Sequence, residues 1–289
     1  MRDLNYRLKG ICNRNRDGSY STRSRRWKEL NLIANQLHEL GYTRFKDPHK
    51  LKGRHVTALV ARWKGEGLAA GTIKTRMSSL RWWAEKVGRE SVVAPRNAAY
   101  GIDNRQFVSN ESKAVFVTHG DLSKVKDAHV RASLELQRAF GLRREESLKL
   151  QPNFADRGDR LVLKASWCKG GRAREIPIRT AEQREALDAA HRLAGRGSMI
   201  PGERSYVEHV KVYERQTASA GLHRLHGLRH AYAQARYEEL TGRAAPAAGG
   251  KPAASLTAEE KAVGREARMT ISSELGHARR QVVSVYCGA

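Results

Sequence analysis

The stretch His226-Gly227-Leu228-Arg229-His230 is the most informative of the chain. It places two imidazoles and one guanidinium, which are common in active sites, at the start of a predicted helix, 226–240. His226 and His230 stand four residues apart, which would suit a pair of metal ligands on one helical face. The zinc motif H-E-x-x-H requires Glu after the first His, and Gly227 occupies that place, with no third ligand evident. We therefore expect no metal here.

Three further stretches, on both sides of this helix, carry chemistry. Gly141-Leu142-Arg143-Arg144-Glu145-Glu146 precedes it, and so does Lys169, which lies in a turn with two adjacent glycines. Leu275-Gly276-His277 follows it, and Tyr286 stands nine residues beyond His277. Each is weak evidence alone, since such an Arg is usually structural, such a Lys merely exposed and such a Tyr a packing residue. Their value lies in their order and spacing.

Taken together, these stretches resemble the tyrosine recombinases, which include phage integrases and chromosome-dimer resolvases. The family pattern is an Arg in G-L-R-x-x-E, a Lys in a hairpin turn before a basic strand ending in Pro, then H-x-L-R-H, L-G-H and a Tyr. Here the basic strand is Arg174-Glu175-Ile176-Pro177. The resemblance is specific over about residues 118–289 and looser over the N-terminal part, through 71–76 and 80–82.

The chemistry of strand transfer explains the residue types. A phosphodiester in transit gathers negative charge on its non-bridging oxygens, and the forked donors of Arg143 and Arg229 can clamp them. His226 and His277 add donors, and one of them can help to take the proton of the Tyr286 nucleophile. Lys169, on a mobile turn, suits a general acid for the leaving 5′ oxygen, and the resemblance implies the same role.

The predicted site therefore has two groups of residues. The expected catalytic set is Arg143, Lys169, His226, Arg229, His277 and Tyr286. Glu146 and His230 are expected to support it, Glu146 by orienting an Arg or His, whereas simple packing is the main alternative for His230. No carboxylate cluster for Mg²⁺ is evident, so we expect neither a metal nor another cofactor, and no ATP.

The charge of the chain points to a polyanionic partner. Lys and Arg number 54 against 30 Asp and Glu, which gives a formal net charge of +24. Each phosphate that such a protein neutralises releases counterions, which favours binding to DNA. We expect double-stranded DNA as the partner, with Lys74, Arg76, Arg81 and Arg174 as candidate DNA contacts. The alternative for these residues is a solvated surface.

Hydrophobic periodicity predicts a mainly α fold (α+β) with three parts. Residues 1–20 are expected to be a flexible basic arm, 21–108 a helical core-binding DNA domain with its linker, and 109–289 a mostly helical catalytic domain. Residues 160–167 and 174–178 are expected to pair as a small antiparallel sheet. A helix is predicted over 122–140. Residues 243–255, rich in Ala, Pro and Gly, are expected to be a flexible loop.

The sequence departs from the family pattern in two places. His230 and His277 are 47 positions apart, about twice the gap that the resemblance implies, and 243–255 accounts for much of the excess. We expect this segment to be a tolerated surface insertion. The sequence also ends three residues after Tyr286, where many relatives have a tail that docks on a neighbouring subunit. Tetramer contacts are therefore expected elsewhere, or only on DNA.

The expected function is site-specific recombination of a phage or other mobile element in a bacterium, by a tetramer on paired sites, with an accessory DNA-bending protein as a candidate partner. Two alternatives remain: a type IB topoisomerase-like enzyme, and a catalytically silent DNA-binding protein. We see no signal peptide, membrane span or lipidation signal, and the three cysteines are odd in number and far apart, which favours reduced thiols. The expected location is the cytoplasm, at the bacterial nucleoid.

Overall fold

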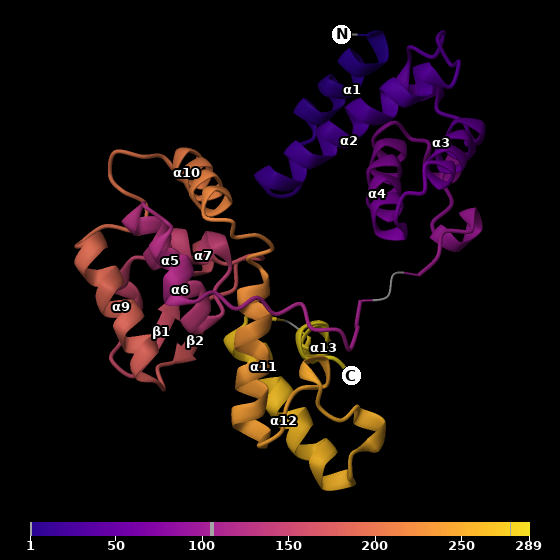
Figure 1. Ribbon diagram of the computed structural model, residues 1–289. Helices are drawn as coiled ribbons and strands as arrows, with labels where there is room; N and C mark the ends of the chain where they lie inside the picture. Colours follow the sequence, from indigo (N-terminus) through magenta and orange to yellow (C-terminus); the bar gives the residue numbers. More distant parts are fainter. Residues whose placement is uncertain (1, 105–106, 278) are drawn as a thin grey trace. The chain divides into compact units, whose positions relative to one another are not determined.

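The computed structural model describes residues 2–104, 107–277 and 279–289. The chain divides into two compact units, 1–106 and 107–289, each with its own hydrophobic core. Both units are mainly helical and the second holds one two-stranded antiparallel sheet, which confirms the predicted fold class (Figure 1). Among the described residues, no helix is both long and apolar enough to span a membrane.

The first unit has four α-helices and short 3-10 turns among its described residues, 2–104. The helices are α1 (Asp3–Arg14), α2 (Tyr20–Glu39), α3 (Gly53–Gly65) and α4 (Ala70–Lys86), and the turns are η1 (Pro48–Lys50), η2 (Glu90–Val92) and η3 (Asn97–Tyr100). The indigo helices α1 and α2 lie side by side in Figure 1. Trp63 and Trp83 fill the centre of this unit and are fully buried. Each indole also donates a hydrogen bond, Trp63 to Gln36 and Trp83 to the Pro48 carbonyl.

The prediction of a flexible arm over residues 1–20 is wrong. Residues 3–14 form α1, whose Leu4, Leu8 and Ile11 are buried in the core of the first unit. These residues recur at i, i+4 and i+7, the spacing of one helical face, and they lie between charged residues that obscure the pattern. The next helix begins at Tyr20, and Ser19 caps it by accepting a hydrogen bond from the Thr22 N–H.

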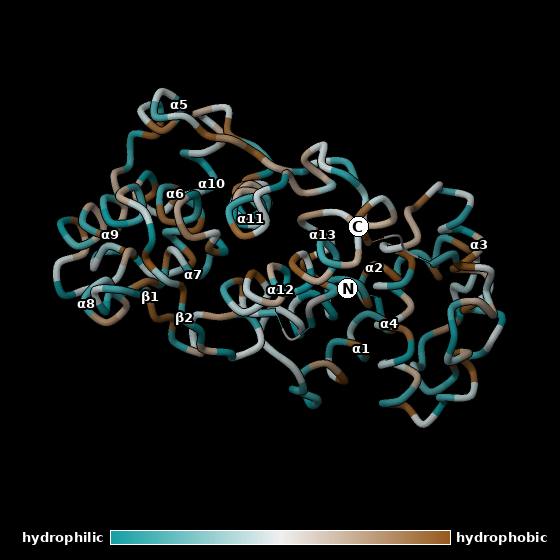
Figure 2. The backbone as a smooth tube through the Cα atoms, turned by 90° about the horizontal axis from the view of Figure 1, so that it is seen from below, coloured by the Kyte–Doolittle hydropathy of each residue, from teal (hydrophilic) through white to brown (hydrophobic). Residues whose placement is uncertain are grey.

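The second unit has nine α-helices and two strands among its described residues. The helices are α5 (His119–Ser123), α6 (Ala128–Phe140), α7 (Arg144–Lys149), α8 (Pro152–Ala155), α9 (Ala181–Ala194), α10 (Tyr206–Ser219), α11 (Gly227–Thr241), α12 (Ala258–Glu274) and α13 (Ser284–Cys287), with β1 (Arg160–Leu163) and β2 (Arg174–Pro177). Short 3-10 turns complete it: η4 (Ala165–Trp167), η5 (Pro246–Ala248), η6 (Ala253–Ser255) and η7 (Arg280–Val282). Along its helices the tube in Figure 2 changes repeatedly between teal and brown, as amphipathic helices do.

The helix predicted over 122–140 is broken in the structure. Residues 119–123 form α5, and α6 begins only after Asp127, whose side chain accepts a hydrogen bond from the Val130 N–H. An Asp at this position satisfies a backbone donor that a new helix would otherwise leave unpaired. The short-range hydrophobic pattern continues across the break, so it did not reveal two helices.

The sheet joins two of the candidate site residues to the core. Leu161 pairs with Ile176 and Leu163 with Arg174, and the side chains of Leu161, Leu163 and Ile176 are fully buried. The first strand ends at Leu163, four residues before the predicted end at Trp167, because 165–167 turn into a 3-10 helix. The connection between the strands carries Lys169 and continues into Arg174.

Part of the segment 243–255 packs into the core of the second unit, so the prediction of a flexible loop is wrong. Ala245 and Ala247 are buried, and Ala245 belongs to the main core of the unit. Gly250 approaches the chain so closely that an added Cβ would lie 1.9 Å from the Ala244 carbonyl oxygen. Small residues allow this segment to fold back on itself. The same Ala, Pro and Gly content led to the prediction of a flexible loop.

Candidate active site

Arg143 and Glu146 face each other across the first turn of α7. One Glu146 oxygen accepts a hydrogen bond from the Arg143 backbone N–H at 2.7 Å, and the other accepts one from the guanidinium Nη1 at 2.7 Å. Glu146 is fully buried, whereas the Arg143 side chain keeps about a fifth of its surface exposed. The carboxylate therefore holds both the backbone and the side chain of Arg143.

Arg174 is the second partner of Glu146. Its two terminal guanidinium nitrogens bind the two Glu146 oxygens at 3.0 and 2.6 Å. The side chain is only 4% exposed. The expectation that Arg174 contacts DNA is not supported by this position, since its guanidinium lies inside the unit and binds a carboxylate. The sequence showed a basic strand but not the direction of this side chain.

Arg229 is almost completely buried, at 1% exposure, and its charge lies at the centre of the site. It donates hydrogen bonds to the main-chain carbonyls of Gly141 (2.6 Å) and Leu275. Its Nη2 also lies 3.4 Å from Nε2 of His277. Its Nε has no hydrogen-bond partner within the part of the chain that the structure describes. A buried and unpaired donor of this kind is costly unless a ligand satisfies it.

Three histidines surround the ring of Tyr286. The centroid of the Tyr286 ring lies 4.6 Å from that of His230, 5.5 Å from that of His277 and 6.0 Å from that of His226. The guanidinium carbon of Arg229 is 5.9 Å from the same ring. Tyr286 is 5% exposed. Residues from α11, the end of α12 and α13 thus converge on one phenol, and α11 lies beside both α12 and α13 (Figure 1).

The ionisable groups of the site influence one another strongly. Burial lowers the pKa of His226, and the positive charges of Arg229, Arg143 and Lys169 lower it further. Burial and the charges of Arg229, Arg143 and Arg174 lower the pKa of His277 to about 3. Both shifts favour the neutral imidazole, in which one ring nitrogen can accept a hydrogen bond.

The pKa of Glu146 moves in the direction that favours its charged form. Burial alone would raise it, but the hydrogen bonds and charge of Arg174, with the charges of Arg143 and Arg229, lower it to about 2. One carboxylate thus faces three guanidinium groups, and the cluster keeps a net positive charge. An anion brought to this cluster would be attracted by it.

Lys169 is exposed at the tip of the connection between β1 and β2. Its positive charge contributes to the lowered pKa of His226. Gly170 and Gly171 follow with positive φ values of 81° and 66°, which bend the chain back toward β2. An exposed ammonium on such a turn can move toward a substrate.

Two residues that contact the candidate site, Gln234 and Glu274, were not predicted from the sequence. Gln234 lies two turns after His226 and one turn after His230 on the same helical face, and its side-chain amide donates to the Tyr286 carbonyl at 2.9 Å. Glu274, which precedes the Leu275-Gly276-His277 motif, binds Tyr232 Oη at 2.7 Å and the guanidinium of Arg236. The repeat of four residues after His226 and His230 is a signal that could have revealed Gln234.

The three other expected DNA contacts lie in the first unit, on α4. Lys74 binds the side chain of Asn104 at 3.2 Å, and Arg76 lies over the ring of Trp63 at 5.3 Å. Arg81 donates to the Ala94 carbonyl at 3.0 Å and to Asn97 at 2.8 Å. All three are half-buried, and Arg81 clearly ties the segment after α4 to the helix.

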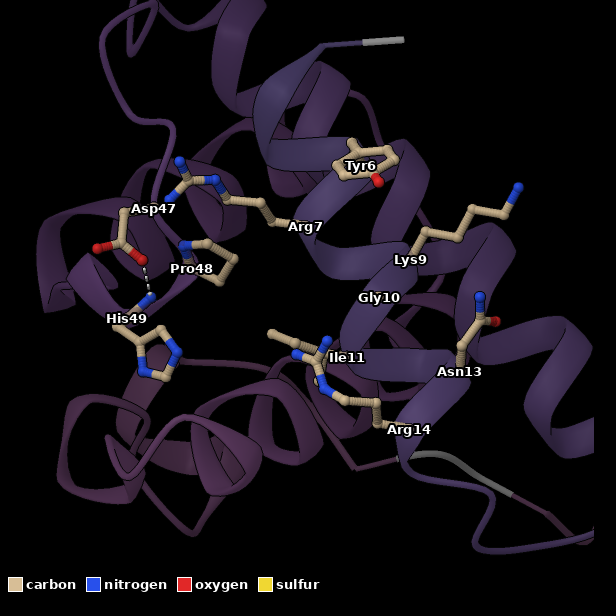
Figure 3. Close-up of a pocket in the computed structure, with 10 residues that line it drawn as sticks. All are labelled: Tyr6, Arg7, Lys9, Gly10, Ile11, Asn13, Arg14, Asp47, Pro48 and His49. Carbon is tan, nitrogen blue, oxygen red and sulfur yellow. Dashed lines mark hydrogen bonds between the residues drawn. The ribbon is translucent and has the colours of Figure 1, made fainter.

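A groove of about 700 Å³ lies in the first unit, and its lining differs from that of the cluster around Tyr286 (Figure 3). Figure 3 shows Arg7 and Arg14 of α1 reaching along it, opposite the Asp47-Pro48-His49 segment. Asp47 accepts a hydrogen bond from the His49 backbone N–H at 3.0 Å, which caps η1. The groove carries none of the predicted catalytic residues.

No group of three or more His, Cys, Asp or Glu residues that could hold a metal ion occurs in residues 2–104, 107–277 and 279–289. The buried Cys168 and Cys287 are free thiols, and burial raises the pKa of each. Neither is poised as a nucleophile, because the thiolate is the reactive form.

Two protein-family models match the sequence. The model described as "Phage integrase, N-terminal" matches residues 1–93, and the model described as "Integrase" matches residues 109–235. The two matches fall in the first and the second unit, respectively. The comparison with curated protein sequences found no match.

Several solved structures have a similar fold. A lambda integrase tetramer bound to a Holliday junction is 16% identical over 96% of this chain and 75% of that one, with a TM-score of 0.59. The XerH site-specific recombinase in a post-cleavage complex is 15% identical over 99% of this chain and 81% of that one, with a TM-score of 0.62. The Tn1549 transposon integrase with circular intermediate DNA is 14% identical over 100% and 96%, with a TM-score of 0.57.

Proposed function

The chain belongs to the tyrosine recombinase family of integrases, and we propose that it cleaves and rejoins DNA at specific sites through a covalent 3′-phosphotyrosyl link to Tyr286. The observation that carries this proposal is the cationic cluster beside the Tyr286 ring. Arg229 lies 5.9 Å from that ring, and its Nε has no hydrogen-bond partner among the residues that the structure describes. The charges of Arg143 and Lys169 also act on this site.

A phosphodiester would complete this cluster. Among the described residues, Glu146 is the one carboxylate that pairs with all of Arg143, Arg174 and Arg229. The non-bridging oxygens of a phosphodiester would supply further negative charge to balance these guanidinium groups. Because the charge on these oxygens grows in the transition state, fixed donors stabilise the transition state more than the bound substrate. This arrangement stabilises phosphoryl transfer in particular.

In the proposed cleavage step, a phosphodiester bond of the DNA is exchanged for a phosphotyrosyl bond. The Tyr286 phenol oxygen attacks the scissile phosphorus, and a neutral His226 or His277 takes the phenol proton. The bond between phosphorus and the 5′ oxygen breaks, and the Lys169 ammonium gives this oxygen a proton, so a free 5′-hydroxyl leaves. Rejoining reverses these steps with the 5′-hydroxyl of another strand. One phosphodiester is consumed and one is formed, so no ATP, metal or other cofactor is required.

The partners follow from the same reaction. Double-stranded DNA is the proposed substrate, which the net charge of +24 favours, and exchange between two duplexes needs four active tyrosines. The fold is shared with an integrase tetramer on a Holliday junction and with a transposon integrase on circular intermediate DNA. We propose that this chain likewise assembles as a tetramer on paired sites and moves a mobile element.

The direct test is a covalent trap. The protein is mixed with a nicked suicide duplex that carries its genomic attachment region, in the presence of EDTA, and a protein–DNA adduct is sought on a denaturing gel. We expect an adduct with the wild type and with the control Tyr206→Phe, and none with Tyr286→Phe. DNA binding by the wild type without any adduct would instead favour a catalytically silent protein.

The topoisomerase alternative has its own readout. A type IB topoisomerase-like enzyme would relax supercoiled plasmids that lack the attachment region. We expect relaxation and adduct formation only with plasmids that carry it. Equal relaxation of both plasmids would overturn site-specific recombination while leaving the phosphotyrosyl chemistry in place.

A further inference from the structure

Arg174 contacts three segments that carry predicted catalytic residues. Its guanidinium binds Glu146 on α7, the Glu274 carbonyl at the end of α12, and the Cys168 sulfur before the hairpin turn. We propose that Arg174 is a positioning residue that fixes Arg143, His277 and Lys169 relative to one another. This inference rests on the proposed function, because it concerns the geometry of the same site.

The first route runs through Glu146 to Arg143. Arg174 binds both oxygens of the carboxylate, at 3.0 and 2.6 Å, in the paired geometry that planar guanidinium groups favour. The same two oxygens hold the Arg143 backbone and side chain, each at 2.7 Å. A carboxylate fixed on one side presents Arg143 in one orientation, whereas a free carboxylate could rotate and carry Arg143 with it.

The second route runs along the chain to His277. Arg174 Nε donates to the Glu274 carbonyl at 2.8 Å, at the point where α12 ends and the turn to His277 begins. The turn fits against the same side chain, because a Cβ on Gly276 would lie 2.8 Å from Arg174 Cδ. Gly276 also has a φ of 64°, which glycine adopts without strain. Arg174 and the turn therefore set each other's position.

The third route reaches the hairpin. Arg174 Nη1 lies 3.1 Å from the Cys168 sulfur, and Lys169 is the next residue. Arg174 itself begins β2, where it pairs with Leu163. The start of the turn that carries Lys169 is thus tied to the same guanidinium.

The competing role, a contact with DNA phosphate, predicts different measurements. A phosphate-contacting Arg weakens DNA affinity when it is removed, and the slope of affinity against salt falls by about 1. Removal of a side chain that is 4% exposed and bound to Glu146 should change neither the DNA affinity nor the salt slope. It should change the rate of cleavage by bound protein, because small displacements of catalytic groups reduce rates by about 100-fold.

The experiment compares Arg174→Met with Arg172→Met, which removes the same charge from an exposed position in the same hairpin. DNA affinity at several salt concentrations and the single-turnover cleavage rate on saturating suicide substrate are measured for each. We expect Arg174→Met to bind with wild-type affinity and salt slope but to cleave about 100-fold more slowly. Arg172→Met should cleave bound DNA at the wild-type rate.

Two further variants keep the proposal open to refutation. If Arg174→Met does not fold, Arg174→Lys keeps the charge but cannot make all of these contacts, and we again expect slow cleavage at normal affinity. In a Glu146→Gln background, Arg174→Met should cost less than it does alone, because part of its effect passes through Glu146. Fully additive losses would overturn that route.

The outcomes separate the two proposals. If the wild type forms no adduct, the proposed function fails. Suppose instead that the wild type forms the adduct. The positioning role of Arg174 then fails if Arg174→Met cleaves at the wild-type rate. It also fails if Arg174→Met lowers the DNA affinity and the salt slope but leaves the cleavage rate of bound DNA unchanged; in both cases the proposed function stands.

Discussion

Glu146 binds Arg143 twice, at 2.7 Å through the backbone N–H and at 2.7 Å through the guanidinium. The carboxylate that caps the start of α7 is therefore also the group that orients a predicted catalytic side chain. Formation of α7 and assembly of the candidate site thus both depend on the Glu146 carboxylate.

Glu146→Gln should lower both stability and cleavage. The substitution leaves the buried Arg174 without its counter-charge, which costs roughly 3–5 kcal/mol in the free energy of unfolding when one partner of a buried pair is lost. The matched control is Glu145→Gln, whose carboxylate pairs with Lys149 at an exposed position. Exposed pairs contribute about 0–1 kcal/mol. Urea unfolding of both variants checks this, and equal losses would contradict the role assigned to Glu146.

Lys169→Ala should slow cleavage of ordinary DNA but not of DNA with a 5′-thiolate leaving group. A thiolate leaves without protonation, so the substrate bypasses the missing general acid. Single-turnover rates on both substrates, with Lys164→Ala as the control, give the measurement. A variant that stays equally slow on the thiolate substrate would remove Lys169 from this role.

Gly227→Ala should disturb the site although Gly227 has no side chain of its own to contribute. An added Cβ would lie 2.3 Å from Val115 Cγ2 and 2.7 Å from the Lys113 carbonyl oxygen, so the strand-like segment before α5 and the start of α11 would have to separate. Overpacking of this kind costs roughly 1–3 kcal/mol. Gly202→Ala, where nothing lies within 4 Å, is the control, and thermal unfolding compares the two.

Stability should fall as the pH falls below 6.5, because buried histidines resist protonation. Burial, with the charges of His226, Lys113 and Arg229, lowers the pKa of His230 to about 4. Between pH 6.5 and about 4 the unfolded chain binds a proton at this residue that the folded chain does not, so the free energy of unfolding decreases. His230→Gln should reduce the fall in Tm between pH 7.5 and 5. An unchanged pH dependence would show that His230 does not contribute to it.

Leu8→Ala should destabilise the first unit by roughly 2–5 kcal/mol, as the loss of a buried leucine does. Leu8 is fully buried in the core beside α2, whereas Tyr6 on the same helix is 71% exposed. Tyr6→Ala is therefore the control and should leave the thermal transition unchanged. Similar transitions for both variants would mean that α1 does not pack as the structure shows.

The sequence by itself determined the helical architecture and the family, because these depend on short-range signals. Helical spacing predicted a mainly helical chain and the helix near 226–240, and two glycines between strand-like runs predicted the hairpin. Predictions failed where a local signal was obscured or composition misled: the spaced leucines of α1 lie among charged residues, and the small residues of 243–255 pack instead of remaining flexible.

Only the tertiary structure decided how the candidate site is held together. Arg174 and Gln234 have partners that are distant in sequence: Arg174 lies 100 residues before the carbonyl that it binds, and Gln234 lies 52 residues before Tyr286. A periodic pattern reports which face of an element is apolar, but not what the face meets. The direction of a buried arginine side chain depends on partners that folding brings together. The sequence therefore could not show that Arg174, predicted to contact DNA, lies inside the unit.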